Sequence, residues 1–229
     1  MKLVILSDIH GNHDALRALP EEYDELWVLG DLVNYGPQPG EVVAEVMERA
    51  SLVVRGNHDH AVACDDDSRW SARYRAMAEA TRRHSSSVLS DAQKAYLRGL
   101  PLHARAERGG VVFHLTHAMP ADPLYGRHPA DAEGWAAELK ALPADVLLVG
   151  HTHVPFLRRV GGKTVLNPGS LGQPRTGAPL ANYAVWQDGR FELKSFRYPV
   201  ETTVEKLRAL ALPRDVESDL VAILETGSA

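Results

Sequence analysis

Cysteine is nearly absent from this chain of 229 residues. Cys64 stands alone, so no disulfide can form within the chain. This fits a reducing compartment, and we expect a cytoplasmic protein. Long apolar stretches are missing too, since none approaches the ~18 residues of a membrane-spanning helix. The apolar run Leu3–Leu6 is too short for a signal peptide and leads directly into Asp8, so we interpret it as the first core strand without a membrane segment.

An excess of positive charge is also lacking. The chain has 25 Lys and Arg residues against 30 Asp and Glu residues, which gives a formal net charge of -5. Broad nucleic-acid binding depends on basic side chains that neutralise phosphates, so we do not expect it here. A phosphate-bearing substrate would need a local source of positive charge, which bound divalent cations can supply.

Apolar strand-like runs alternate with helical patterns along the chain, which predicts a layered α/β fold. The length favours a single domain over residues 1–229. In the first two thirds we expect strands at 2–7, 25–29, 51–55, 102–106, 110–116 and 145–149, and helices at 13–19, 40–50, 66–86, 90–98 and 131–141.

The last third is richer in strands. Turn signals at Gly161-Gly162 and Asp188-Gly189 predict two hairpins, formed by runs 155–160 with 163–167 and 181–187 with 190–197. The tail 200–225 has helical periodicity interrupted at Pro213. The helices expected within 66–98 form a helical flank or cap.

Side chains that can bind hard metal ions follow five of the strand-like runs. Because ligands gather at the carboxyl ends of strands in α/β sheets, we expect these side chains to converge on one pocket. The five segments are Asp8-Ile9-His10, Gly30-Asp31, Gly56-Asn57-His58-Asp59, His117 and Gly150-His151-Thr152-His153.

The first two segments are weak signals by themselves. Asp8 and His10 stand at alternate positions after a strand, so their side chains can point to one side and share a cation. A capping aspartate beside a surface histidine is an equally common reason for that spacing. Asp31 can bridge two cations, or it can belong to an ordinary Gly-Asp turn.

The third segment combines three kinds of side chain. The amide oxygen of Asn57 suits a hard cation, and His58 can donate a proton to a leaving alkoxide. Asp59 can orient the His58 ring or cap a helix, and we favour a mixed role.

The last two segments strengthen the metal interpretation. His151 and His153 stand at alternate positions after the apolar run 146–149, and two buried structural histidines at one strand end are uncommon. His117 ends another strand-like run and completes the set.

Taken together, these segments resemble the calcineurin-like metallophosphoesterase superfamily, whose pattern reads D-x-H, G-D, G-N-H-D/E, H and G-H-x-H in this order. The resemblance extends over roughly residues 3–171 and includes the turn Asn167–Ser170. The strings 7–12 and 30–37 resemble the small bacterial and archaeal branch of the superfamily. The resemblance implies a four-layer α-β-β-α sandwich of two mixed sheets with the site at one edge.

The resemblance also implies two metal ions. One would be held by Asp8, His10, Asp31 and His153, and the other by Asp31, Asn57, His117 and His151. Carboxylate, amide and imidazole ligands without thiolate suit several divalent ions; we expect Mn, with Fe, Zn, Co and Ni as alternatives. The ions would activate a shared water for attack on phosphorus, while His58 protonates the leaving oxygen.

Three further residues are candidate substrate contacts. Asn12 directly follows the first ligand-bearing turn, Arg175 can present its guanidinium to phosphate, and Tyr35 can stack against a leaving group. A solvated loop position for Arg175 and a packing role for Tyr35 are the alternatives. Ala118 follows His117 where many relatives carry glycine, which restricts the turn there.

The expected function is therefore hydrolysis of phosphodiester or phosphomonoester bonds in small phosphate or nucleotide substrates. The alternatives are a protein phosphatase and a non-catalytic scaffold of the same fold. The full set of ligands favours hydrolysis. The expected partner is a small phosphate ester, and the strand-rich third or the tail can support a homo-oligomer.

Overall fold

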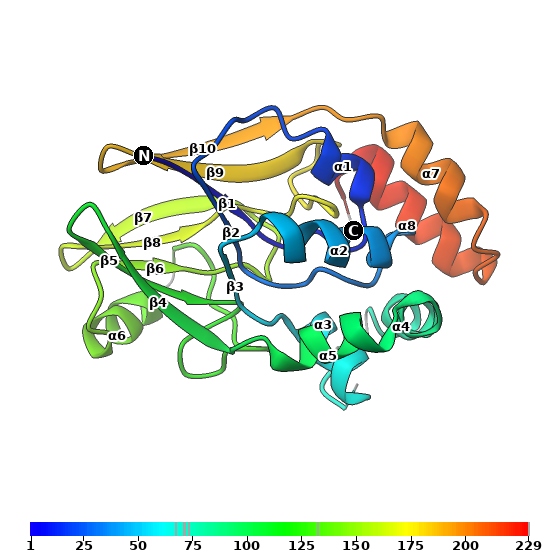
Figure 1. Ribbon diagram of the computed structural model, residues 1–229, viewed down its shortest axis with the longest axis horizontal. Helices are drawn as coiled ribbons and strands as arrows, with labels where there is room; N and C mark the ends of the chain where they lie inside the picture. The colour runs from blue at the N-terminus through cyan, green and yellow to red at the C-terminus, as the bar shows by residue number, and fades with distance from the viewer. Residues whose placement is uncertain (67, 71, 73, 132, 229) are drawn as a thin grey trace.

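A computed structural model describes residues 1–66, 68–70, 72, 74–131 and 133–228. Two five-stranded sheets, each with parallel and antiparallel pairs, stack against each other (Figure 1). The first sheet has the order β10 (Arg190–Phe196), β9 (Ala181–Gln187), β1 (Lys2–Leu6), β2 (Glu25–Val28), β3 (Leu52–Val53). The second has the order β4 (His103–Arg108), β5 (Val111–Thr116), β6 (Val146–Leu148), β8 (Lys163–Asn167), β7 (Phe156–Val160).

Strand β1 shows why the sheets stack. Side chains alternate along a strand, so Leu3 and Ile5 point to one face and Val4 and Leu6 to the other. Leu3 and Ile5 belong to the core between the sheets, where Phe113 of the second sheet is also buried. Each such buried apolar side chain contributes roughly 1.5–3 kcal/mol.

Helices cover the outer faces of both sheets. On the first sheet, α1 (His13–Arg17) and α2 (Pro39–Arg49) bury side chains such as Val43 against Val4 and Leu6 of β1. On the second sheet, α6 (Gly134–Ala141) buries Trp135 and Leu139. The four-layer α-β-β-α sandwich implied by the sequence is thus confirmed.

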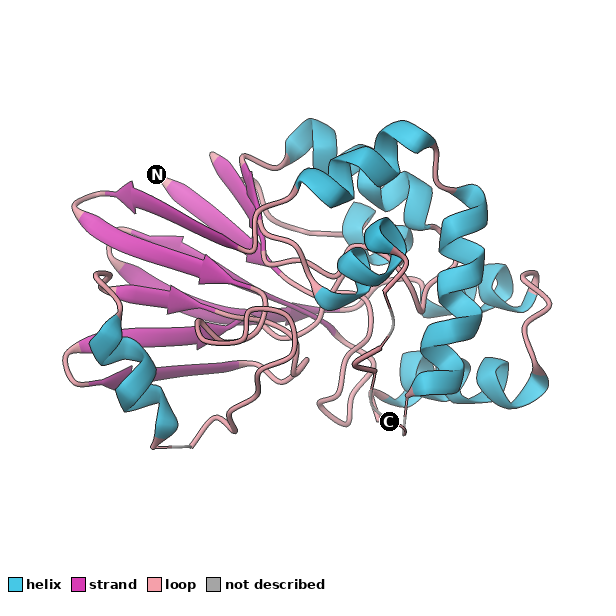
Figure 2. Ribbon diagram, turned by 90° about the horizontal axis from the view of Figure 1, so that it is seen from below, coloured by secondary structure: helices cyan, strands magenta, loops and turns pink. Residues whose placement is uncertain are grey.

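A group of helices lies at one end of the two sheets (Figure 2). It contains α3 (Asn57–Cys64), α4 (Arg75–Val88), α5 (Asp91–Gly99), α7 (Val200–Arg208) and α8 (Arg214–Thr226). Strand β1 runs from the N-terminus toward this end (Figure 1). The loops after the parallel strands therefore lie between the sheets and the helices.

Most predicted elements are present, with three differences. Helix α4 begins at Arg75 and not at 66; residues 68–70 are not helical, and 67, 71 and 73 lie outside the described residues. Helix α6 begins at Gly134 and not at 131, and position 132 is also outside the described residues. Helix α3 was not predicted, because its ligand-bearing first turn resembles a loop and the helix is only 8 residues long.

Both hairpins and the interrupted tail agree with the prediction. Strands β7 and β8 pair through Val160 and Lys163, and β9 and β10 pair through Gln187 and Arg190. The tail forms α7 and α8, and the gap between these helices, residues 209–213, contains Pro213.

Candidate metal centre

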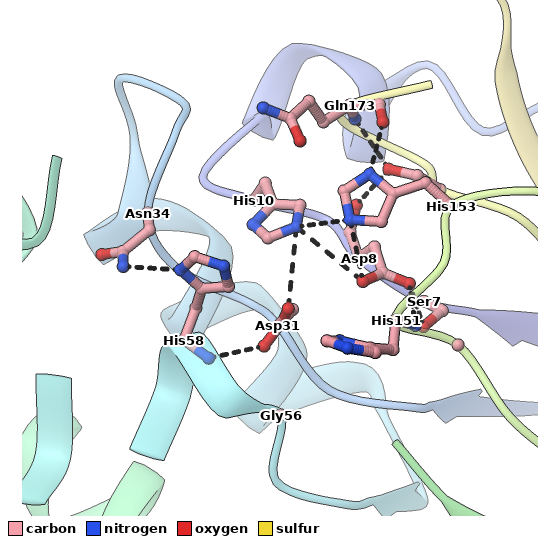
Figure 3. A network of polar contacts seen from close by, with 12 residues as sticks. Ser7, Asp8, His10, Asp31, Asn34, Gly56, His58, His151, His153 and Gln173 are labelled. Atoms are coloured by element: carbon pink, nitrogen blue, oxygen red, sulfur yellow. Dashed lines mark hydrogen bonds and ion pairs between the residues drawn. The ribbon is translucent and has the colours of Figure 1, made fainter. Parts of the chain in front are cut away.

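The seven predicted ligand side chains lie together, in the loops after β1, β2, β5 and β6 and at the start of α3. Figure 3 shows Asp8, His10, Asp31, His151 and His153 around one point. Six of them form two buried groups whose ligand atoms lie within 4.8 Å of one another: Asp8, His10 and His153, and Asp31, His117 and His151. Oδ2 of Asp31 lies between the groups, 3.2 Å from Nε2 of His117 and 3.7 Å from Nε2 of His10. The seventh ligand, Asn57, places its Oδ1 3.1 Å from Nε2 of His117.

The ligand-bearing backbone is locally strained. Five of the seven predicted ligands have positive φ between 49° and 65°, the left-handed region that residues other than glycine rarely adopt. Such conformations cost on the order of 1–3 kcal/mol each and persist where surrounding contacts enforce them. The five residues are Asp8, His10, Asp31, His151 and His153.

Backbone hydrogen bonds and close approaches hold these turns. The amides of Asp8 and His10 donate to the carbonyls of Gly30 and Asp31 at 3.0 and 2.9 Å, which ties the loop after β1 to the loop after β2. Any Cβ at Gly56 would lie 2.1 Å from Oδ1 of Asp31, so only glycine fits there. Ala118 is outside the left-handed region, so the turn after His117 does not require glycine.

The first group is a cluster of hydrogen-bond acceptors. Nδ1 of His10 donates to the Val33 carbonyl at 3.1 Å, and Nδ1 of His153 donates to the Gln173 carbonyl at 2.7 Å. A neutral imidazole has one N–H, so Nε2 of each ring presents a lone pair. These Nε2 atoms are 3.2 Å apart, and Oδ1 of Asp8, 3.3 Å from that of His153, accepts no hydrogen bond from the described residues. The arrangement is repulsive unless a cation lies among the three atoms.

The second group also brings polar side chains close together. Nδ1 of His117 donates to the Leu29 carbonyl at 2.7 Å, so its Nε2 lone pair faces the oxygens of Asp31 and Asn57 when the ring is neutral. Oδ1 of Asn57 is also 3.0 Å from Nδ1 of His151. Four polar side chains thus converge on one buried point.

The pKa shifts reflect this density of charge. Burial opposes protonation of His117, but the Asp31 carboxylate raises the pKa of His117 to about 9. Burial would raise the pKa of Asp31, yet the His117 and His58 rings hold it well below its usual range. Burial lowers the pKa of His10 and His151 well below the ordinary value. These directions favour an ionised Asp31 and a protonated His117 as long as no cation is bound.

The donor set fits divalent cations. Carboxylate and amide oxygens with imidazole nitrogens, without thiolate, suit Mn, Fe, Co, Ni and Zn. The backbone carbonyls that accept from His10, His117 and His153 fix the ring tautomers, as partners of metal-bound histidines commonly do. The orphaned oxygen of Asp8 and the facing lone pairs are what a bound cation would satisfy.

His58 lies beside the two groups but is oriented by a residue that the sequence did not point to. Nδ2 of Asn34 donates to Nδ1 of His58 at 2.9 Å (Figure 3), which leaves the ring proton on Nε2. Burial lowers the pKa of His58 to about 4, so the ring is neutral near pH 7. Its backbone amide donates to Oδ1 of Asp31 at 2.8 Å, which couples the ring to the metal groups.

The predicted role of Asp59 as the group that orients His58 is wrong. Its carboxylate accepts three backbone hydrogen bonds, from Asp31 and Leu32 at 2.8 Å and from Gly56 at 2.9 Å. Burial and the Asp31 charge raise the pKa of Asp59 to about 7, against the effect of the amide donors. Asp59 caps α3 and holds the loop that carries Asp31, so the capping half of the prediction stands.

The predicted substrate contact of Asn12 is also wrong. Its Oδ1 accepts from the Ala15 amide at 3.0 Å as the N-cap of α1, while Nδ2 donates to the Gly172 carbonyl at 3.1 Å and the Tyr198 hydroxyl at 2.9 Å. The side chain is 1% exposed. Because its polar atoms are used internally, Asn12 fastens the first ligand loop and does not face solvent.

Tyr35 and Arg175 line a cavity next to the ligands. The Tyr35 ring packs 4.7 Å from that of His10 and 4.6 Å from that of His58, so it contacts the site and the core at once. The guanidinium of Arg175 lies 4.4 Å from the centroid of the Tyr74 ring. Both remain candidates for substrate contact.

The cavity has a volume of about 290 Å³. Asp31, Asn57, His58, His151 and His153 border it from the ligand side. Besides Ala78 of α4, five further lining residues were missed in the sequence: Arg69, Trp70, Tyr74, Tyr125 and Arg127. They lie in or beside loops without hydrophobic periodicity or a ligand motif, so the sequence holds no signal that distinguishes them.

Comparison with known proteins identifies the family. The calcineurin-like phosphoesterase superfamily domain matches residues 1–187. An uncharacterized protein of Methanocaldococcus jannaschii is 28% identical and aligns over 92% of this chain and 93% of its own length. Phosphodiesterase YfcE of Escherichia coli is 28% identical over 79% of this chain and 85% of its own length. The crystal structure of a metallophosphoesterase from Sphaerobacter thermophilus has a TM-score of 0.81 and 28% identity, covering 97% of this chain and 99% of that one.

The chain belongs to the calcineurin-like phosphoesterase superfamily. It is a phosphoric ester hydrolase, and the family implies divalent metal ions at the two groups of His and Asp side chains. Within the described residues, the helices are too short or too polar to cross a bilayer.

Proposed function

We propose that the chain hydrolyses phosphodiester bonds of small phosphate or nucleotide substrates, with two divalent ions held at the seven ligand side chains. The main support is the cluster of acceptors in which Nε2 of His10, Nε2 of His153 and Oδ1 of Asp8 face one another within about 3–4 Å. The ions would lower the pKa of a shared water and neutralise charge on the phosphoryl oxygens. Mn is the ion we favour.

The protein's own groups account for the rest of the chemistry. Asp31, between the two groups, is positioned to be shared by both ions. His58, held by Asn34 with its proton on Nε2, borders the cavity and can donate that proton to the leaving oxygen. Tyr35 packs against His10 and His58 and limits the movement of both rings.

The dimensions of the cavity favour a small substrate over a phosphoprotein. Its volume of about 290 Å³ is at the lower end of the ~300–1,000 Å³ typical of small-molecule pockets. Arg69 and Asp122, which pair at 2.6 Å, join the loop before α4 to the loop after β5 beside the cavity. The complete ligand set argues against a scaffold without catalysis.

Hydrolysis assays on purified protein test the proposal. The protein is treated with chelator, reloaded separately with Mn, Fe, Zn, Co and Ni, and assayed with bis(p-nitrophenyl) phosphate and p-nitrophenyl phosphate. Metal content is measured in parallel. We expect two ions per chain, loss of activity on chelation, and a higher kcat/KM for the diester. Absence of hydrolysis in every metal-loaded form would contradict the proposal, and a higher kcat/KM for the monoester would reverse the preference.

A further inference from the structure

We propose that the outer part of the cavity binds a second phosphate of the substrate together with a nucleoside, so that the preferred substrate is a nucleotide carrying at least one phosphate beyond the one attacked. The inference rests on the proposed function, because it takes the scissile phosphate to lie at the ligand groups. It adds Arg127 and the aromatic lining to the residues that determine specificity.

The cavity has more positive charge than a single phosphodiester requires. Arg69, Arg127 and Arg175 line it, and Asp31 is the only carboxylate among its described lining residues. Arg69 is neutralised by Asp122, to which it makes two hydrogen bonds of 3.2 and 2.6 Å. The charges of Arg127 and Arg175 remain for a ligand.

Arg175 is arranged to receive an anion. Its guanidinium lies 4.4 Å from the centroid of the Tyr74 ring, which supports the group from one side. Nη2 makes a long hydrogen bond of 3.3 Å to Oε1 of Gln173, and Nε has no partner among the described residues. Most of the five N–H donors of the guanidinium therefore stay available to phosphate oxygens.

Arg127 lies next to the ligand His151. Its Nε donates to Nε2 of His151 at 3.0 Å, while Nδ1 of that ring faces Oδ1 of Asn57. An imidazole that gives the Nδ1 lone pair to a cation keeps its proton on Nε2 and cannot accept from Arg127. With the ligand groups filled, the guanidinium is thus free to bind an anion beside the scissile phosphate.

Aromatic side chains supply the surface for a base. Trp70, Tyr74 and Tyr125 line the cavity together with Tyr35. The Trp70 ring stacks on that of His58 at 5.9 Å and 26°, and its Nε1 donor is buried without a partner among the described residues. Flat rings beside arginines are the features that bind nucleobases by stacking. The volume of about 290 Å³ suits one nucleotide rather than two.

Ligand affinity tests the subsite by a readout other than turnover. Titration calorimetry on Mn-loaded protein, at fixed free Mn²⁺, compares AMP, α,β-methylene-ADP and methylenediphosphonate. We expect α,β-methylene-ADP to bind about tenfold or more tightly than either of the others, the scale of a charge-assisted hydrogen-bond pair. Equal affinity for AMP would refute the second phosphate site, and equal affinity for methylenediphosphonate would refute the nucleoside site.

Two substitutions locate the effect. Arg127→Gln and Arg175→Gln should each lower the preference for α,β-methylene-ADP over AMP about fivefold or more, and Arg127→Lys should restore part of it. Arg159→Gln, on an exposed position of β7, is the matched control and should change nothing. An unchanged preference in both Gln variants would overturn the assignment.

A parallel assay with bis(p-nitrophenyl) phosphate separates this inference from the proposed function. Hydrolysis of the diester without any ligand preference would refute the subsite alone. A ligand preference in a protein that hydrolyses no phosphodiester would refute the proposed reaction and leave the subsite intact.

Discussion

The floor and the wall of the cavity are built in different ways. The floor consists of Asp31, Asn57, His58, His151 and His153, which lie in the loops after β2 and β6 and at the start of α3 and are at most 7% exposed. The wall consists of Arg69, Trp70, Tyr74, Tyr125 and Arg127, which lie in or beside the loops before α4 and after β5.

The difference extends to the contacts that hold each part. Floor side chains are fixed by buried hydrogen bonds to backbone and to other side chains, such as those from His153 to the Gln173 carbonyl and from Asn34 to His58. Wall side chains are held by ring and ion contacts such as Arg69 over Tyr125, 4.3 Å from the ring centroid. A rigid floor suits a fixed reaction, whereas loop-borne walls can vary with the substrate.

The largest effect is expected at the centre of the floor. Asp31→Asn removes the charge that both ligand groups share but keeps the shape, so activity should fall on the order of 10³-fold or more, equivalent to roughly 4 kcal/mol of transition-state stabilisation. Metal content should fall below two ions per chain. Asp122→Asn, at the rim of the wall, is the control and should retain both ions. If Asp31→Asn kept the wild-type metal content and rate, the floor would not be the part of the cavity that holds the metal ions.

His58 tests whether the floor separates proton transfer from metal binding. His58→Ala should lower kcat on the order of 10²-fold, the usual contribution of a general acid, while metal content stays at the wild-type value. Full activity would remove His58 from the mechanism. Loss of metal would instead assign the ring a structural role beside Asp31.

The pH dependence of metal binding measures the electrostatics of the floor. His117, with its pKa raised to about 9, must lose a proton before a cation can bind at Nε2. Below that pKa, Mn²⁺ affinity should therefore rise about tenfold per pH unit as the pH increases. Calorimetry in buffers of different ionisation enthalpy counts the released protons. A flat affinity between pH 6 and 8 would contradict a proton on His117.

The floor could be predicted from sequence because its signals are local. Each ligand directly follows an apolar run that forms a strand, and strand ends meet at one edge. Asp8 and His10 converge through left-handed turns and not through the strand alternation that their spacing suggested. From the sequence alone, Asp59 was given the wrong partner and Asn34 was missed. Hydrogen bonds between loops that follow different strands decide the roles of both residues.

The wall could not be predicted, because its residues come from separate loops that meet only in the folded chain. Trp70 and Arg127 are 57 positions apart in the sequence but line the same cavity. Arg175 was identified only as a possible phosphate contact, and nothing near it in the sequence points to its Tyr74 partner. Neither residue type nor spacing distinguishes such side chains from solvated loop residues.

Asn34 provides a smaller effect within the floor. Asn34→Ala removes the donor to Nδ1 of His58, so the ring can exchange tautomers and kcat should fall roughly 10-fold, the scale of outer hydrogen-bond partners. KM should change little. Nitrogen NMR of the His58 ring distinguishes positioning from general destabilisation: the wild type should show the proton on Nε2, and the variant a mixture. A variant ring with the proton still fixed on Nε2 would exclude this role.

The smallest effect is expected at the rim of the wall. Asp122→Ala breaks the exposed pair with Arg69, and exposed ion pairs contribute little because water and salt screen them. Metal content and kcat should be unchanged, while KM for an anionic nucleotide should fall by less than about threefold, since Arg69 gains a free charge beside the cavity. Steady-state kinetics at low and high salt check this, because the decrease in KM should disappear at high salt. A large loss of kcat or metal would mean that the rim supports the floor, and the two regions would no longer be separable.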